Sequence, residues 1–203
     1  MSELHAASVT LARTLTAGGT VFQIGGADRA VDGYVLLDVD SAEAALRERS
    51  RTGDSVLVVG EFVDRDRILR RCPAWGIASV WVGTDGRPEP GLASVTLLVP
   101  DALAALAAVT SEATTLTGDV AAIAPAIVDC TDEVCITCSD EGRLGEVIAP
   151  AVDFAPALVR TADGEEEVDV TIIGAVGPQD LILIHAGSAI AVIPDPIPTG
   201  STR

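Results

Sequence analysis

The stretch Gly53-Asp-Ser-Val-Leu-Val-Val-Gly60 contains a short apolar run, residues 55–59, that is bracketed by glycine. An apolar run without alternation of polar residues is typical of a strand buried on both faces, as in a parallel sheet. Helical patterns alternate with such runs over residues 1–118, so we predict a doubly wound α/β domain there. The other predicted strands are 20–24, 34–39, 78–82 and 94–99, and the predicted helices are 4–17, 41–50, 64–71 and 101–117.

Composition narrows the classes of function. The chain has 203 residues, 48% of them hydrophobic, so it can bury a core and is not expected to be disordered. Its 30 acidic residues against 13 arginines give a formal charge of −17, which repels nucleic acid and acidic membrane surfaces. The chain contains no lysine, which excludes a Schiff-base lysine and a phosphate-binding-loop lysine.

The start of the chain, MSELHAASVT, lacks the charged and apolar regions of a secretory signal. The longest apolar stretch, residues 181–193, is too short to cross a bilayer and is interrupted by His185. We therefore predict a cytoplasmic protein with reduced cysteines.

The second half of the chain differs from the first in charge and in predicted secondary structure. Residues 1–118 carry 15 acidic residues and 10 arginines, whereas residues 119–203 carry 15 acidic residues and only 3 arginines. Short predicted strands follow one another here, separated by turn signals, which favours a small closed or nearly closed β-barrel. We predict a linker over 119–134, a barrel over 135–195 and a flexible tail over 196–203. The predicted strands are 142–149, 157–161, 167–173, 180–185 and 188–193.

Three cysteines lie close together as Cys130-x4-Cys135-x2-Cys138. Thiolates are soft ligands that select iron, zinc or copper(I). An iron–sulfur cluster would need a fourth cysteine nearby, and a closed zinc site would need His5 or His185 as its fourth ligand. We interpret Cys130 as a small buried residue, whereas the polar neighbours of Cys135 and Cys138 favour a ligating or reactive role.

His185 ends the most apolar predicted strand. Periodicity alone favours equally a functional histidine and a half-buried structural histidine whose ring nitrogens have hydrogen-bond partners. The surrounding run, Gly177-Pro-Gln-Asp-Leu-Ile-Leu-Ile-His185-Ala-Gly187-Ser-Ala-Ile-Ala-Val-Ile193, resembles the G-D-(Y/W)-V-L-V-H-x-G-x-A-(I/M) stretch of the HypC/HupF family of [NiFe]-hydrogenase maturation chaperones. Residues 135–148 are similar to the opening of that family, and 166–173 resemble its central strand.

The resemblance implies an OB-like barrel that holds an Fe(CN)2CO unit on a cysteine, docks on the HypD-type scaffold protein and delivers the unit to the hydrogenase large-subunit precursor. His185 and Gly187 match the family motif, and we assign them to partner contact or to orientation of the cysteine loop. The family cysteine is the second residue of the chain, whereas Cys135 and Cys138 are internal, and either can take its place. The proline between cysteine and glycine is absent here, and a proline-rich tail replaces the final helix.

The first half resembles a sugar isomerase (SIS) domain in its glycine-bounded segments 18–26, 53–60 and 76–83. SIS domains bind phosphosugars at a strand-to-helix turn, where this chain has Gly60-Glu61-Phe62-Val63-Asp64. Two carboxylates would repel a phosphate, so we predict an inactive site and a dimerisation or docking role. Gly25-Gly26 is interpreted as a pair of turn glycines.

The leading hypothesis is therefore a non-enzymatic hydrogenase-maturation chaperone with transient iron cargo at Cys135 or Cys138, no organic cofactor and a homodimer through the first domain. One alternative is a phosphosugar-binding isomerase or sensor. Another is a redox protein that uses Cys135-x-x-Cys138 as a dithiol.

Overall fold

The computed structural model describes residues 3–25, 30–49, 55–59, 65–83, 92–98, 101–117, 142–152 and 155–195. The chain separates into two compact units. Of the described residues, the second unit contains Pro73–Trp75, 142–152 and 155–195, and the first unit contains the rest. Each unit is described by itself below.

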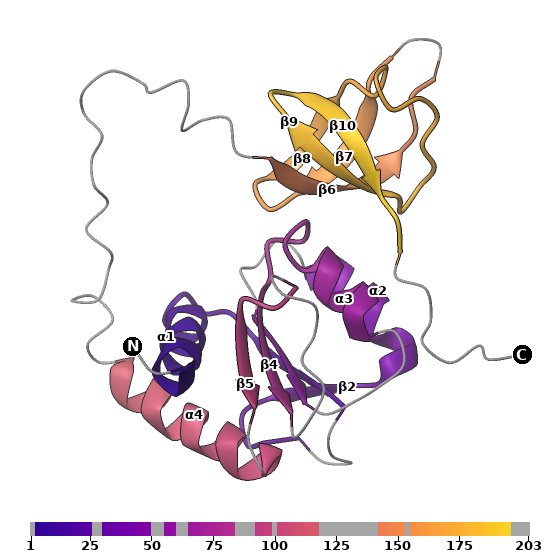
Figure 1. The fold of residues 1–203 in the computed structure, drawn as a ribbon. Helices are drawn as coiled ribbons and strands as arrows, with labels where there is room; N and C mark the ends of the chain where they lie inside the picture. The colour runs from indigo at the N-terminus through magenta and orange to yellow at the C-terminus, as the bar shows by residue number, and fades with distance from the viewer. Residues whose placement is uncertain are drawn as a thin grey trace, which may run out of the picture. The chain divides into compact units, whose positions relative to one another are not determined.

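The first unit is built on a five-stranded sheet in which every pair of neighbouring strands is parallel (Figure 1). The strand order is β2-β1-β3-β4-β5, so the order of strands reverses between β1 and β3. The apolar runs explain the arrangement, because β1 is buried at every position and β4 at nearly every one. The strands are β1 (Val21–Ile24), β2 (Val35–Leu37), β3 (Ser55–Val59), β4 (Ala78–Gly83) and β5 (Val95–Leu98).

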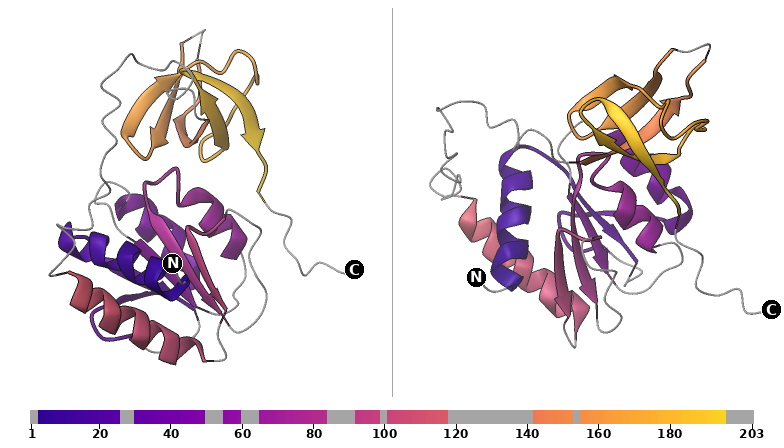
Figure 2. Two further views of the ribbon diagram at one scale, coloured as in Figure 1. Left: turned by 60° about the vertical axis from the view of Figure 1, so that its left-hand side comes forward. Right: turned by 45° about the horizontal axis from the view of Figure 1, so that its top comes forward.

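Helices cover both faces of this sheet. On one face, α1 and α4 pack over a core that includes Leu11, Val80 and Leu106, and α2 and α3 lie on the other face (Figures 1 and 2). Asp101 caps α4 by accepting a hydrogen bond from the Ala104 amide at 3.1 Å. The predicted mixture of helices and strands is present. The helices are α1 (Glu3–Thr16), α2 (Val39–Arg49), α3 (Arg65–Arg71) and α4 (Ala102–Leu116).

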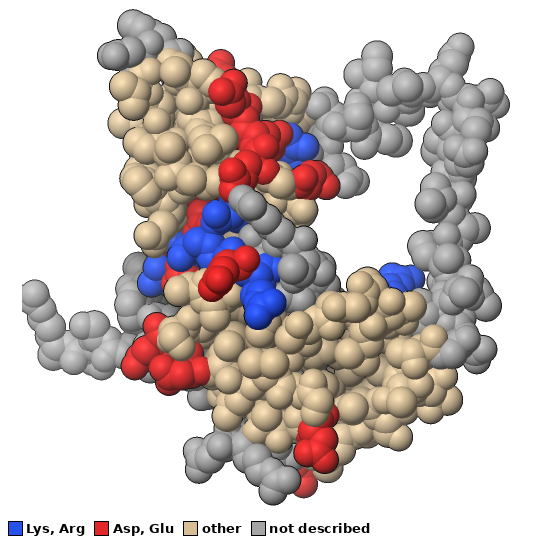
Figure 3. All heavy atoms as spheres, turned by 180° about the vertical axis from the view of Figure 1, so that it is seen from behind, with Lys and Arg blue, Asp and Glu red and all other residues tan. Residues whose placement is uncertain are grey.

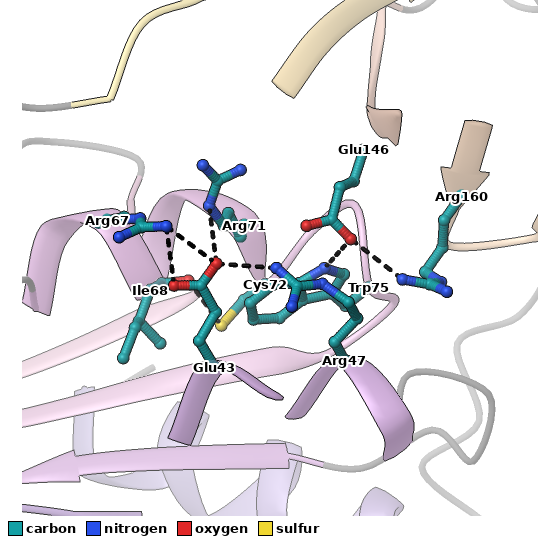
Figure 4. A network of polar contacts seen from close by, with 9 residues as sticks. All are labelled: Glu43, Arg47, Arg67, Ile68, Arg71, Cys72, Trp75, Glu146 and Arg160. Atoms are coloured by element: carbon teal, nitrogen blue, oxygen red, sulfur yellow. Dashed lines mark hydrogen bonds and ion pairs between the residues drawn. The ribbon is translucent and has the colours of Figure 1, made fainter. Parts of the chain in front are cut away.

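A single carboxylate joins α2 to α3. Glu43 accepts a hydrogen bond from Arg47 Nη2 at 2.8 Å, and its carboxylate lies 3.2 Å from Arg67 Nη2 and 3.6 Å from Arg71 Nε (Figure 4). These arginines belong to a larger group on the two helices. The group comprises Arg47, Arg49, Arg65, Arg67, Arg70 and Arg71.

The second unit is a five-stranded antiparallel sheet in the order β10-β9-β6-β7-β8. Its core contains Val147, Val159, Val168, Ile182 and Ile184, which alternate along their strands with residues of the opposite face. Figure 2 shows that this sheet is strongly curved. The strands are β6 (Arg143–Ala149), β7 (Ala157–Thr161), β8 (Gly164–Val168), β9 (Leu181–His185) and β10 (Ser188–Ile193).

Of the predicted closed or nearly closed barrel, the structure has the five strands in one antiparallel sheet but not the closure. The edge strands β8 and β10 form no ladder, and the segment after β8 meets β10 only at an isolated bridge between Asp169 and Ser188. The reason is local. The Asp169 carboxylate accepts hydrogen bonds from the amide and the hydroxyl of Thr171, which turns the chain away directly after β8.

The predicted strand 167–173 is wrong for the same reason, because β8 spans Gly164–Val168 and residues 171–173 form a turn. The short connection between β7 and β8 fixes this register by pairing Thr161 with Gly164. The apolar residues that suggested a longer strand serve different purposes: Val170 is buried in the core, whereas Ile172 is exposed.

Within the described ranges, none of the helices combines the length and apolar character needed to span a membrane. The predicted linker 119–134 and tail 196–203 lie outside the described residues.

Gly145 on β6 provides a test of the packing in the second unit. A Cβ atom at this position would collide with Val159 Cγ1 and would lie 2.6 Å from Ile184 Cδ1. We expect Gly145→Ala to lower the free energy of unfolding by about 1–3 kcal/mol, measured by urea unfolding of the full chain. Gly177→Ala is the matched control, because its nearest neighbour would be Asp180 Oδ2 at 3.7 Å. Equal losses in the two variants would contradict this account of the packing.

Candidate functional site

The predicted site residues divide into two groups. Cys130, Cys135 and Cys138 lie outside the described residues, as does the acidic turn 60–64 of the first unit. His185 and Gly187 are described and lie in the second unit. The site is therefore built from the hairpin that carries His185 and from the strand to which the cysteine segment is joined.

His185 and Gly187 lie at a tight hairpin between β9 and β10. His185 pairs with Ser188, so the connection consists of Ala186 and Gly187 alone. Both have positive φ values, 48° and 79°, as in the mirror-image turns that match the twist of a β-hairpin. His185 is partly buried at the end of β9, while Ala186 and Gly187 are exposed. The hairpin thus fixes the backbone of His185 directly before an exposed turn.

Asp169 holds this hairpin from the side, and the sequence analysis missed it. Its amide donates to the Gly187 carbonyl at 3.1 Å, and its carbonyl accepts from the Ala189 amide at 2.7 Å. Hydrogen bonds from Thr171 keep the pKa of the Asp169 carboxyl below its ordinary value. The bond from the Thr171 hydroxyl has the larger effect and the bond from the Thr171 amide the smaller one. The Asp-x-Thr spacing, typical of side-chain turns, is the sequence signal that could have revealed it.

The start of β6 lies beside the same hairpin. Arg143 pairs with Ile184 in the antiparallel ladder, so Gly142 stands next to the end of β9 that carries His185. A Cβ atom on Gly142 would lie 3.1 Å from Leu183 Cδ1, which confirms the close approach. Arg143 Nη2 also donates to Glu166 Oε2 at 2.6 Å, which links β6 to β8.

The cysteines precede this point closely in the sequence. Cys138 is four residues before Gly142 and Cys135 is seven residues before it. Both cysteines lie outside the described residues, so their connection to β6 is given by the sequence alone.

The second unit also contains a buried carboxylate that the sequence analysis did not single out. Glu146 on β6 is 1% exposed. Its Oε2 accepts hydrogen bonds from Arg160 Nη1 and from the indole Nε1 of Trp75, both at 3.0 Å (Figure 4). A buried carboxylate oxygen with two hydrogen-bond donors has its polar needs met inside the protein. We therefore interpret Glu146 as a structural group of the sheet.

Cys72 is the cysteine that the structure describes, and its thiol is unsuited to metal binding or to nucleophilic reactions. It is fully buried, and its Sγ donates to the Ile68 carbonyl at 3.3 Å. Burial raises the pKa of its thiol to about 12, so it stays protonated at neutral pH.

His5 is engaged within the first unit, because its Nδ1 lies 2.7 Å from Glu112 Oε1 and so joins α1 to α4. No group of three or more His, Cys, Asp or Glu side chains that could hold a metal ion occurs in the part of the chain that the structure describes.

The carboxyl edge of the parallel sheet is the other place where ligands commonly bind in this architecture. Gly25 follows β1 with φ of +66°, consistent with its interpretation as a turn glycine. The Arg65 guanidinium lies over the Trp81 ring at 5.3 Å and its Nε lies 2.8 Å from Asp66 Oδ1. This cation is thus already held by an aromatic face and a carboxylate.

No protein-family model matches this chain, and the search of curated proteins gives no significant match.

Ala186 provides a test of the hairpin. A non-glycine residue in the left-handed region costs roughly 1–2 kcal/mol, and asparagine tolerates this region better than alanine does. We expect Ala186→Asn to raise the free energy of unfolding by about 1 kcal/mol and Ala186→Val to lower it, measured by urea unfolding. Identical stabilities for the three proteins would show that the turn has a different conformation.

Cys72 provides a pH-dependent test. Its folded-state pKa is about 12 against an ordinary value of 9.0, so the folded protein retains a proton that the unfolded chain loses. The associated stability is complete below pH 9 and falls as the pH rises toward 12. Between about pH 8 and 10.5, wild type should lose about 2 kcal/mol more than Cys72→Ala in urea unfolding. Parallel pH profiles for the two proteins would contradict a buried thiol.

Proposed function

We propose that this protein is a non-enzymatic accessory chaperone in [NiFe]-hydrogenase maturation, which carries an Fe(CN)2CO unit as cargo on Cys135 or Cys138. The observation that supports it best is the register of β6 against β9, which puts Gly142 beside the His185 hairpin. Residues 142–148, the described part of the stretch that resembles the opening of the HypC/HupF family, thereby lie beside the histidine motif in one sheet.

A thiolate is suited to a carrier. Soft sulfur ligands bind a low-spin iron that already carries diatomic ligands, and such a ligand can be exchanged when the cargo is transferred. In the proposal, the internal Cys135 or Cys138 supplies this ligand from the segment that precedes β6 in the sequence. His185 and Gly187 orient the cysteine loop or contact the partner, because their hairpin is fixed by the Asp169 backbone.

The finer interpretation of the two units belongs to the same proposal. The curved antiparallel sheet, bridged once between Asp169 and Ser188, is interpreted as an open relative of the OB-like barrel. The parallel sheet with order β2-β1-β3-β4-β5 is interpreted as a SIS-like domain without catalytic activity, which serves in docking or in pairing of two copies. The proposed partners are a HypD-type scaffold protein and the hydrogenase large-subunit precursor, both in the cytoplasm.

Infrared spectroscopy tests the carrier role. The purified full chain is mixed with the cognate loaded scaffold protein, separated from it again and examined for nitrile and carbonyl bands. We expect these bands on wild type, and we expect the Cys135→Ala/Cys138→Ala double variant to lose them because the soft ligand is absent. The two single variants then identify the ligand.

Cys130→Ala and Cys72→Ala are the matched controls, since each removes one thiol and should retain the bands. Absence of the bands on wild type, or undiminished bands on the double variant, would rule out the carrier role.

A further inference from the structure

The two edges of the antiparallel sheet differ in chemistry. The edge strand β8 has the sequence Gly-Glu-Glu-Glu-Val, and three consecutive carboxylates discourage another strand from pairing with it. The opposite edge strand β10 has the sequence Ser-Ala-Ile-Ala-Val-Ile, without a charged residue or a proline. The protection recorded in β10 is a register shift between Ala189 and Ala191 in its pairing with β9, and the strand continues beyond it to Ile193. An apolar edge without charges or proline is a site for strand addition.

The exposed surface of β10 supports this contrast. Ile190 is 44% exposed and Val192 is 42% exposed. Among the described residues, the outer edge of β10 meets Asp169 at its first two residues, through the bridge to Ser188 and the hydrogen bond from the Ala189 amide. The part of the edge from Ile190 onward extends beyond this bridge.

Charge indicates which strand can pair there. Residues 181–194 contain no acidic or basic side chain apart from His185, although the half of the chain that includes them carries most of the net negative charge. In Figure 3 the acidic atoms of the second unit are grouped along one strip, with uncharged surface beside it. Two copies of this chain, each with a charge of −17, repel each other less where the facing surfaces are uncharged than where acidic residues face each other.

We propose that β10 is a homodimerisation edge, at which the β10 strands of two copies pair antiparallel about a twofold axis. An isologous pairing centred on Ala191 sets Ile190 of one copy opposite Val192 of the other, so two half-exposed apolar side chains cover each other on each side of the axis. The same pairing through β8 would bring six glutamates together. This dimer is independent of the carrier role and uses a different surface from a dimer through the first unit.

Sedimentation velocity of the full chain tests the proposal. Wild type should show a monomer–dimer equilibrium at concentrations from about 1 to 100 µM. The dimer should be tighter at about 500 mM than at about 50 mM NaCl, because salt screens the repulsion between the two acidic copies. Val192→Lys and Ile190→Lys should each weaken the dimer at least about tenfold, since each puts a charge on the pairing edge.

Ile172→Lys is the matched control. Ile172 is an apolar residue of the same unit that is 71% exposed in a turn, so a lysine there should leave the dimer unchanged. Hydrogen exchange at the β10 amides of wild type gives a second measurement that needs no substitution, and protection should increase with protein concentration.

Three results in sedimentation velocity, and one in hydrogen exchange, would overturn the proposal. The first three are a monomeric wild type at every concentration and salt, a dimer unaffected by Val192→Lys and Ile190→Lys, and equal weakening by Ile172→Lys. The second result would place the dimer interface on another surface. Protection of the β10 amides that does not depend on concentration would show that the edge is covered within a single chain.

Discussion

The pairing of β6 with β9 is the interaction on which the second unit depends. It joins segments that are about forty residues apart in the chain and makes β6 the central strand of the sheet. Gly145 permits it, because a side chain there would occupy the space that Val159 and Ile184 fill. The core and the position of the hairpin beside Gly142 both follow from this one register.

The parallel sheet was predictable because burial on both faces leaves a strong signal. Strand β3 matches the predicted 55–59, and the neighbouring strands differ from their predicted ranges by one or two residues at their ends. Glycine and proline residues marked the ends of helices in the sequence. Helix α1, for example, was predicted over 4–17 and spans Glu3–Thr16. Periodicity gave no sign that one carboxylate, Glu43, would gather three arginines from two helices, because that contact depends on tertiary packing.

The antiparallel sheet was less predictable because its decisive contacts are polar and local. The run from Val168 to Ile173 looks like a strand by composition, yet the Asp169 side chain binds Thr171 and competes with the sheet for the backbone. Barrel closure was expected from short strands and exposed edges, but those features do not specify the register in which edges meet. Glu146 shows the same limit, since an acidic residue between apolar ones does not reveal the arginine that pairs with it on β7.

The candidate site combines both kinds of information. The strands that end at His185 and begin at Ser188 were predicted from the sequence. These predicted ends leave two residues for the hairpin turn between them. That Gly142 lies beside this hairpin required the register, which the sequence pattern left open. In the proposed carrier this division has a physical rationale. The hairpin that carries His185 has the Asp169 backbone bound on one side, so it would give a partner a constant surface to recognise, whatever the conformation of the segment that carries the proposed cysteine ligand.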